Sequence, residues 1–335
     1  MCKKLGLEAN FHILNDREPK NVILNYIVRS LNSTFFLPES LKKIEPNFVY
    51  SVTEHYYDVA PALILKKRFK CQWKAVIHWV APIKRNGNLL SNVLFYIQQR
   101  LGLMLIKNNA DDILAVSTKT KDSLIQIGYN PLKIHAVACG VDLQRINEIY
   151  VKNRDNDKKY DAIFIKRFHS AKGVFDTIRI WEEVVKSKPN AKLILIGGGS
   201  EKILTSLQKI IKDKNLSKNI IIKGIIYDFE IKMKLIMQSK MFILPSYEEN
   251  WAIVIGEALA SRIPVICYDI PEIRPIWDKY VKWVEKGNIT NFAEEIIKTL
   301  DEGTSEDVND LGREYMERYD WLKISNDELS FKKFD

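Results

Sequence analysis

The sequence predicts an α/β protein whose parallel sheets are divided between two domains. Its 335 residues are long for one core and suit two domains of about 150 residues each. Hydrophobic residues make up 46% and charged residues 28%, a balance that excludes a disordered or collagen-like chain. In the second half, short apolar segments alternate with stretches of helical length, a pattern typical of a parallel, doubly wound sheet.

A polar connection divides the chain. Residues 151–160 are nearly all charged or polar and predict an exposed linker. We therefore expect a first domain over 1–150, a second over 158–305 and a helical tail over 306–335.

The predicted strands are short apolar runs separated by helical stretches. In the second half they are 161–165, 191–196, 220–222, 241–244 and 264–268. The helices between and after them are expected at 174–186, 202–212, 228–238 and 252–261. The first half shows a weaker alternation, with strands expected at 11–14, 48–52, 74–79, 113–116 and 134–138.

Cysteine spacing and hydropathy indicate the compartment. The four cysteines lie far apart without a CxxC pair, which excludes a zinc ribbon or a disulfide framework. The first dozen residues include charged side chains and do not predict a signal peptide. Residues 88–106 contain too many polar side chains to predict a membrane span. We expect a cytoplasmic protein that at most touches a membrane surface.

The net charge of +9 is unevenly distributed. No acidic residue lies between Asp58 and Asp111, whereas this interval holds many lysines and arginines. Such a stretch predicts an anionic partner: nucleic acid, acidic lipid or a phosphorylated substrate. The alternative is a solvated basic face without a partner. We do not expect nucleic acid, because the stretch carries no recognition motif.

The most informative segment runs from Met241 to Ile273. An apolar strand leads into Pro245 and Ser246, and Glu249 and Glu257 follow with seven residues between them. This segment resembles the family-4 retaining glycosyltransferases, in which a strand, Pro-Ser and Glu-x7-Glu precede a helix and another strand. Further matches follow the family's order at 110–117, 140–142, 166–173 and 193–201, with a weaker one at 318–321.

The resemblance implies the GT-B arrangement, in which two Rossmann-like α/β domains face each other across a cleft. It also implies transfer of a sugar from a UDP- or GDP-linked donor, with retention of the anomeric configuration and without a metal or other cofactor. Arg167 and Lys172 would neutralise the leaving diphosphate, Glu249 would position the donor sugar, and Glu257 would bind the ribose hydroxyls. The other donor-binding residues implied are Gly198, Ser246, Asn250, Trp251 and Ala252.

The chain departs from the family pattern at two places. Residues 250–252 read Asn-Trp-Ala where the family has a Gly-rich turn, so we expect Trp251 to reshape the sugar pocket. Residues 2–11 resemble the end of the helix that follows the family's first strand and Gly-rich loop. We therefore expect the first domain to be incomplete at its start.

Several residues of the first half are candidates for the acceptor side and for catalysis. His78 follows an apolar strand, and the family often places a histidine there against the donor sugar; the alternative is a histidine that only bonds backbone. His55 is a weaker candidate on the acceptor side. Lys66, Lys67 and Arg68 lie in a run that mixes apolar and basic residues, as interfacial segments do. A glycan or lipid-linked acceptor at an anionic membrane surface is therefore our hypothesis.

Two other functions remain open. One is a nucleotide-sugar epimerase on the same architecture, and the other is a non-catalytic nucleotide-sugar-binding protein. A dehydrogenase is disfavoured, because no G-x-G-x-x-G opens a helix near the start of either half. Residues 155–157 read Asp-Asn-Asp, but we expect a solvated loop there because no apolar strand precedes them. We expect no metal site.

Overall fold

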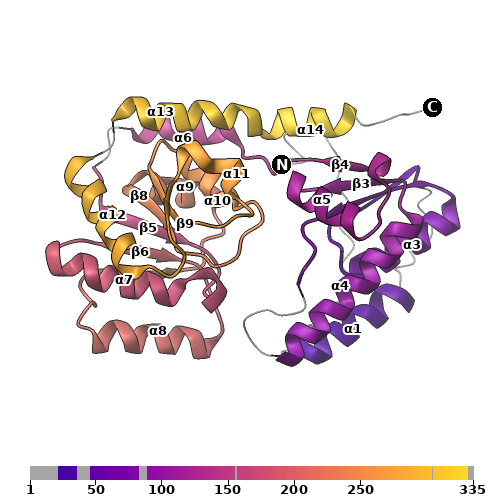
Figure 1. Cartoon of the computed structure of the whole chain (residues 1–335), viewed down its shortest axis with the longest axis horizontal. Coiled ribbons are helices and arrows are strands. Elements are labelled where there is room, and N and C mark those ends of the chain that lie inside the picture. Colours follow the sequence, from indigo (N-terminus) through magenta and orange to yellow (C-terminus); the bar gives the residue numbers. More distant parts are fainter. Residues whose placement is uncertain (1–21, 36–45, 83–88, 155–156, 304, 331–335) are drawn as a thin grey trace. The chain divides into compact units, whose positions relative to one another are not determined.

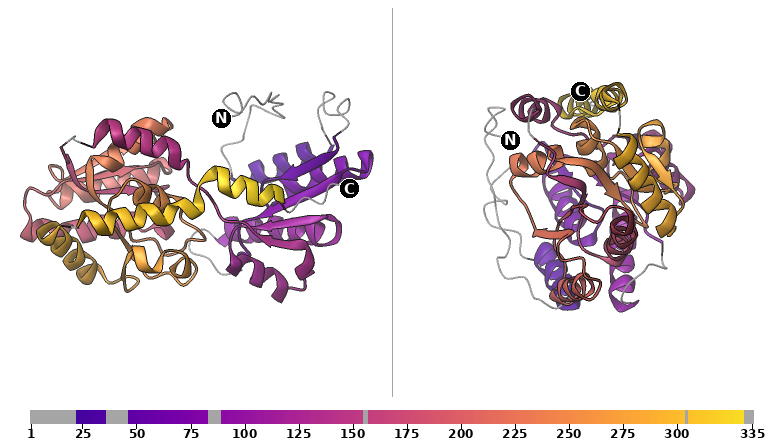
Figure 2. Two further views of the ribbon diagram at one scale, coloured as in Figure 1. Left: turned by 90° about the horizontal axis from the view of Figure 1, so that it is seen from above. Right: turned by 90° about the vertical axis from the view of Figure 1, so that its left-hand side faces the viewer.

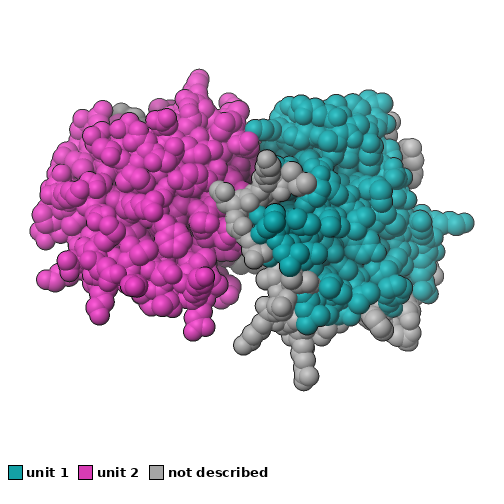
Figure 3. Space-filling model, turned by 60° about the horizontal axis from the view of Figure 1, so that its bottom comes forward, with its two compact units in different colours: residues 1–137 teal, residues 138–335 magenta. Residues whose placement is uncertain are grey.

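The structure is a computed structural model that describes residues 22–35, 46–82, 89–154, 157–303 and 305–330. The chain forms two compact units, unit 1 (Met1–Val137) and unit 2 (Ala138–Asp335), which Figure 3 shows in different colours. The boundary therefore lies before residue 138, and the predicted boundary at 150 is wrong.

The helix α6 (Leu143–Asn153) explains this difference. Leu143, Ile146 and Ile149 lie on one face of the helix and are buried in the core of unit 2, where α6 packs against α9 (Phe229–Met237). An amphipathic helix is assigned to the core that buries its apolar face, and the sequence did not reveal which core that was.

Within its described residues, unit 1 contains a four-stranded parallel sheet in the order β1-β2-β3-β4. Its strands are β1 (Phe48–Ser51), β2 (Gln72–Ile77), β3 (Asp112–Ala115) and β4 (Ile134–Ala136). Each matches a predicted strand to within two residues at either end. The strand predicted at 11–14 and the resemblance over 2–11 lie outside the described residues.

Four helices of unit 1 are described (Figure 1). They are α1 (Val22–Phe35), α3 (Tyr56–Phe69), α4 (Leu89–Asn109) and α5 (Thr118–Gln126). Helices α1, α3 and α4 pack against one another. Leu103 and Ile106 of α4 join Trp73, Ile77 and other buried side chains in the core of this unit.

Helix α4 differs from the prediction made for residues 88–106. By its length and composition alone, it is apolar enough to cross a membrane, in spite of its polar side chains. Criteria of this kind are also met by helices that cover a sheet in a globular protein. Because α4 packs along α3 and supplies core residues to unit 1, it is part of the helical layer of this unit.

The described part of unit 2 contains a six-stranded parallel sheet in the order β10-β9-β8-β5-β6-β7. Its strands are β5 (Tyr160–Ile165), β6 (Leu193–Ile196), β7 (Ile220–Gly224), β8 (Ser239–Leu244), β9 (Val265–Tyr268) and β10 (Lys282–Val284). Strands β5, β6, β8 and β9 are wholly or mainly buried, as expected of strands with helices on both faces. The prediction contained five of the six strands and missed β10.

The connecting helices of unit 2 begin at recognisable capping residues. Ser200 and Asp228 accept hydrogen bonds from the backbone of the first turns of α8 (Glu201–Asp213) and α9. The remaining helices are α7 (Val174–Ser187), α10 (Ile253–Ala260), α11 (Arg274–Trp277) and α12 (Ile289–Glu302). The alternation of strands and helices predicted for residues 158–305 is therefore confirmed.

The tail is helical, as predicted. It consists of α13 (Glu306–Tyr315), the 3-10 turn η5 (Met316–Tyr319) and α14 (Trp321–Ser330), which follow one another with a short break at η5 (Figure 2). Helix α13 packs against α10, and Val141 exchanges backbone hydrogen bonds with Tyr319 and Trp321. The tail from 306 to 319 is thus fixed to unit 2. Its expected return to the first domain stays a prediction.

Candidate active site

A buried carboxylate between two lysines lies at the carboxyl end of the unit 2 sheet. Glu249 follows β8, Lys166 follows β5, and Lys172 ends the 3-10 turn η3 (Ser170–Lys172). Glu249 Oε2 accepts a hydrogen bond from Lys166 Nζ at 2.9 Å, and Oε1 lies 3.3 Å from Lys172 Nζ. Ser246 Oγ donates to Glu249 Oε1 at 3.0 Å. Ligands of parallel α/β sheets bind at this edge, so the position suits a substrate site.

The charges of this cluster sum to one excess positive charge. Burial by itself raises the pKa of Glu249, but Lys166 and Lys172 outweigh burial and lower it below its usual value of 4.5. Burial lowers the pKa of Lys172, and the nearby Glu249 opposes that shift. Glu249 is therefore ionised at neutral pH, and two ammonium groups share one carboxylate. An anion such as a diphosphate would find an uncompensated positive charge here.

Two glycines allow the loops of the cluster to approach so closely. Gly173 has φ +70°, and a Cβ at this position would lie 1.7 Å from the carbonyl oxygen of Pro245. Gly197 has φ +149°, and its Cβ would lie 1.8 Å from the carbonyl oxygen of Lys166. No other residue type fits either place without movement of the backbone. The loops after β5, β6 and β8 are thus packed backbone to backbone around Glu249.

Glu257 presents an unsatisfied oxygen. It lies in α10, and its Oε1 accepts a hydrogen bond from Lys232 Nζ at 2.6 Å. Its buried Oε2 has no hydrogen-bond partner within the part of the chain that the structure describes. An unpaired buried carboxylate oxygen is costly unless a ligand satisfies it, and ribose hydroxyls are donors of the right kind.

The structure brings only part of the predicted set to Glu249. Lys172 and Ser246 contact it, whereas Arg167 is exposed and forms no ion pair among the described residues. Lys166, which the sequence analysis did not single out, pairs with Glu249, and the expected contact of Arg167 with the donor diphosphate stays a prediction. The sequence contained a signal for Lys166, since it is the first residue after a buried strand, but the family motif drew attention to its neighbour.

Gly198 and Asn250 lie in the loops after β6 and β8. The carbonyl oxygen of Gly198 accepts a hydrogen bond from the backbone of Phe168 at 2.7 Å, which ties this loop to the one that holds Lys166. Asn250 is half-buried next to Glu249. Their predicted contact with the donor stays a prediction.

Trp251 lies in the core of unit 2, and its expected effect on the sugar pocket stays a prediction. Its indole is buried and packs edge to face against Trp277 and Tyr319, with ring centroids 5.7 Å and 5.1 Å apart. This aromatic cluster joins α11 and the tail to the segment that precedes α10. An indole has a large apolar surface, so its burial in the core is more favourable than its exposure in a polar site. The following residue, Ala252, has φ +58°, a conformation that favours glycine.

His78 and His55 lie near the carboxyl edge of the unit 1 sheet. His78 follows β2, and its Nδ1 lies 3.4 Å from Oε2 of the buried Glu54. His55 precedes α3 and stacks on Tyr57, and its buried Nδ1 has no hydrogen-bond partner within the described residues. Burial lowers the pKa of His55. The sequence pointed to both histidines but not to Glu54.

The basic residues predicted for the acceptor side lie at the opposite edge of this sheet. Lys66, Lys67 and Arg68 occupy the last turn of α3, a helix of 14 residues that begins beyond the carboxyl end of β1. Such a helix is about 21 Å long, so its last turn lies near the amino ends of the strands. Lys66 also forms an ion pair with Asp111 at 2.6 Å. The three residues therefore lie away from His55 and His78, and their expected role on the acceptor side stays a prediction.

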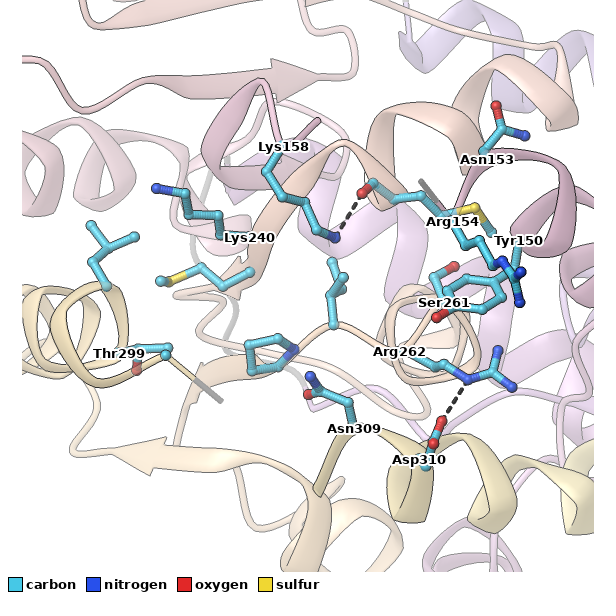
Figure 4. Close-up of a pocket in the computed structure, with 16 residues that line it drawn as sticks. Tyr150, Asn153, Arg154, Lys158, Lys240, Ser261, Arg262, Thr299, Asn309 and Asp310 are labelled. Atoms are coloured by element: carbon cyan, nitrogen blue, oxygen red, sulfur yellow. Dashed lines mark hydrogen bonds and ion pairs between the residues drawn. The ribbon is translucent and has the colours of Figure 1, made fainter. Parts of the chain in front are cut away.

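A cavity of about 720 Å³ lies elsewhere in unit 2 (Figure 4). It is lined by the starts of β8 and β9 and by the ends of α6, α10 and α12, so it is at the amino edge of the sheet. Arg262 in its wall pairs with Asp310, and Lys158 donates to two backbone carbonyls. Cations at helix carboxyl ends stabilise the unpaired carbonyls there. The cavity contains none of the residues of the Glu249 cluster.

Family profiles match nearly the whole chain. The profile of glycosyl transferases group 1 matches residues 145–316, and that of glycosyltransferase family 4 matches residues 5–145. The chain belongs to the family-4, group 1 glycosyltransferases.

Characterised and uncharacterised family members resemble the chain over different lengths. A processive diacylglycerol alpha-glucosyltransferase of Acholeplasma laidlawii is 36% identical over 253 residues, which cover 72% of this chain and 73% of that protein. An uncharacterized glycosyltransferase of Methanocaldococcus jannaschii is 26% identical over 273 residues, or 77% of this chain and 64% of that protein. The alpha-monoglucosyldiacylglycerol synthase of A. laidlawii is 31% identical over 43% of this chain, which corresponds to 34% of that protein.

Solved structures confirm the GT-B fold. HepE of Anabaena, solved with UDP and glucose, superimposes with a TM-score of 0.73 and 14% identity over 99% of this chain and 88% of its own. TarM of S. aureus superimposes with a TM-score of 0.67 and 19% identity over 90% of this chain and 58% of its own. At these identities the comparison bears on the fold alone.

Proposed function

We propose that the protein is a retaining glycosyltransferase that transfers a sugar from a UDP- or GDP-linked donor to a lipid-linked or glycan acceptor. The cluster of Lys166, Lys172 and Glu249 supports this proposal most directly, because it combines an excess positive charge with a buried acceptor group. The unsatisfied Oε2 of Glu257 supports a ribose contact in the same unit.

The reaction needs two contributions from these residues. Lys172, with Lys166 and Arg167, stabilises the diphosphate as the bond between the sugar and the phosphate oxygen breaks. Glu249 accepts hydrogen bonds from sugar hydroxyls and so positions the ring. The acceptor oxygen bonds to the anomeric carbon on the face that the diphosphate leaves, and its proton passes to a diphosphate oxygen. Retention follows from that shared face. No metal is required, because ammonium groups supply the positive charge.

The acceptor proposal is supported by an apolar surface on unit 1. Helices α1 and α4 pack side by side (Figure 1), and neither contains an acidic residue. Their exposed apolar side chains recur at helical spacing: Leu24, Ile27, Leu31 and Phe35 on α1, and Leu89, Leu90, Val93, Ile97, Leu101 and Met104 on α4. A surface of this kind suits the interface of an anionic leaflet. Two relatives are named for acting on diacylglycerol lipids. The enzyme would then be cytoplasmic and peripheral to the membrane.

Thermal unfolding in the presence of nucleotides tests the donor site. UDP or GDP should raise the melting temperature to the same extent with magnesium and with EDTA, and ADP should not. The change K172A should abolish the shift. The matched control K214A removes a lysine whose partner, Glu182, lies on the surface of the same unit, and it should leave the shift intact. A shift that requires magnesium would contradict the metal-free mechanism.

Vesicle sedimentation tests the acceptor surface. The wild-type protein should sediment with vesicles that contain phosphatidylglycerol and stay in solution with pure phosphatidylcholine. The double change L90D/M104D alters two half-exposed side chains of α4 and should weaken sedimentation at least about tenfold, since it removes apolar contact and adds repulsion. L132D changes an exposed leucine outside α1 and α4 and serves as the control. Equal loss in both variants would refute this surface.

Product analysis separates the proposed transferase from an epimerase or a binding protein. Transferase activity requires that release of the nucleoside diphosphate depends on added acceptor, here diacylglycerol in mixed micelles. The anomeric coupling constant in the proton NMR spectrum of the product reports retention or inversion. Nucleotide release without acceptor would favour the epimerase, and binding without any turnover would favour the binding protein.

A further inference from the structure

A buried carboxylate connects three segments of unit 1 around His78. Glu54 follows β1 and is only 2% exposed. Its Oε2 accepts a hydrogen bond from the backbone N–H of His78 at 3.0 Å and lies 3.4 Å from His78 Nδ1. Its Oε1 accepts a hydrogen bond from Gln99 Nε2 at 2.9 Å. Both oxygens therefore face donors.

Gln99 of α4 holds the loop after β2 in the same arrangement. Its side chain is fully buried. Its Oε1 accepts from the backbone N–H of Ala81 at 2.8 Å, and its Nε2 also donates to the carbonyl oxygen of Trp79 at 3.1 Å. These two contacts fix the orientation of the Gln99 amide, so its N–H group can only point to Glu54. A residue at 54 must accept on both sides, and a carboxylate is the side chain that does so.

Close packing prevents Glu54 from moving away. Gly102 of α4 lies directly against its backbone, and a Cβ on Gly102 would be 2.0 Å from the carbonyl oxygen of Glu54. The adjacent His55 packs edge to face on Phe95 of α4. Residue 54 is thus held by both its side chain and its main chain, which is the condition for orienting a neighbouring group.

The electrostatics around His78 favour one form of its ring. Burial alone raises the pKa of Glu54, but the hydrogen bonds and charge of His78 outweigh burial and lower it. Glu54 is therefore ionised at neutral pH. A carboxylate beside one ring nitrogen of histidine favours the proton on that nitrogen, which here is Nδ1. The His78 side chain is 47% exposed, so part of the ring is open to a ligand.

We propose that Glu54 is a positioning residue that holds His78 in the tautomer protonated on Nδ1 and so presents Nε2 as an acceptor for a sugar hydroxyl. This role rests on the proposed glycosyl transfer. Gln99 acts through Glu54 by fixing its second oxygen. A purely structural Glu54 would only satisfy the backbone of residue 78, and the ring would then take the tautomer that an unconstrained histidine prefers, with the proton on Nε2.

Long-range proton–nitrogen NMR of the ¹⁵N-labelled full chain tests this directly. At about pH 8.5, where an ordinary imidazole is neutral, the His78 signals should show the proton on Nδ1. They are assigned by their absence from H78Q. In E54A they should change to the Nε2-protonated pattern. In the matched control D112A, which removes the carboxylate 3.3 Å from His135 Nε2 in the same sheet, the His78 signals should not change.

The outcomes are separable. A wild-type His78 protonated on Nε2 overturns the proposal without any variant, so the test does not depend on the folding of E54A. A folded E54A that keeps the proton on Nδ1 also overturns it. In the transferase assay, E54A should lower kcat at least about tenfold while the donor KM stays within about threefold, and D112A should leave both unchanged. An inactive wild-type chain with the Nδ1 proton would overturn the proposed function but support the positioning role of Glu54.

Discussion

Replacing Glu249 with glutamine should destabilise unit 2 because it leaves two half-buried ammonium groups without their counter-charge. Lys166 Nζ and Lys172 Nζ lie 2.9 Å and 3.3 Å from the two carboxylate oxygens, and Ser246 also donates to one of them. In all three contacts the carboxylate faces a hydrogen-bond donor. A glutamine side chain has an N–H group in place of one carboxylate oxygen and would point it at one of these donors.

The size of the effect follows from these distances. At an effective dielectric constant of about 20, each ammonium–carboxylate attraction amounts to roughly 5–6 kcal/mol. Most of this is offset by the cost of removing the charges from water. Breaking one partner of a buried pair costs about 3–5 kcal/mol, and the lysines keep some solvent contact, so we expect about 3 kcal/mol. For a unit of this size that loss corresponds to a fall in Tm of about 6–12 °C.

Urea denaturation followed by tryptophan fluorescence measures the change, because Trp181, Trp251 and Trp277 are buried in unit 2. The pH dependence supplies a second test. The pKa of Glu249 in the folded chain lies below the usual 4.5. Its stabilising contribution is therefore fully present above pH 4.5 and is lost as the pH falls through the lower folded value. The difference between wild type and E249Q should shrink in that acid range.

The control is E182Q. Glu182 pairs with Lys214 at 2.7 Å, but both side chains are about one third exposed. Exposed pairs contribute little, so we expect a loss of about 0.5 kcal/mol or less. If E249Q were as stable as wild type, or if its deficit were the same at pH 3.5 and pH 7, the charge cluster would not stabilise the loops as we argue.

Three further changes test the packing around the site. A252G should raise the free energy of unfolding by about 0.5–1 kcal/mol in urea, because Ala252 has φ +58°; a loss would show that its methyl group packs favourably. W251A should cost about 3–5 kcal/mol, whereas W321A, at a half-exposed tryptophan, should cost under about 1 kcal/mol; equal costs would contradict the aromatic cluster. G102A should lower stability by about 1–3 kcal/mol and displace Glu54, detected as a change in the His78 NMR signals; unchanged signals would contradict the close packing.

Much of the fold could be predicted from local patterns, because most strands and several helices of unit 2 have their own signal in the sequence. Buried parallel strands such as β6 and β8 are continuous apolar runs, and the helices begin at Ser200 and Asp228 in accordance with capping preferences. β10 was missed because its three residues include a lysine and are only partly buried. The domain boundary was misplaced because α6 is amphipathic whichever core it joins.

The candidate site was only partly predictable. Glu249, Ser246 and Lys172 stand at fixed places in a recognisable motif, and the structure brings them together. Lys166 and Glu54 carry no motif of their own. Their roles depend on contacts between the loops that follow β5 and β8 and between those that follow β1 and β2. These contacts join residues that are 24 to 83 positions apart in the chain.

The sequence by itself determined the parallel α/β architecture, the strand-end positions of the acids and the basic character of the first half, because these depend on neighbours along the chain. Only the tertiary structure decided that Trp251 belongs to the core and that the last turn of α3 lies away from His78. It also decided that Lys166, which no motif singled out, pairs with Glu249. Burial and charge pairing depend on contacts between distant segments, and a short motif specifies a residue's place in the chain without specifying the direction of its side chain.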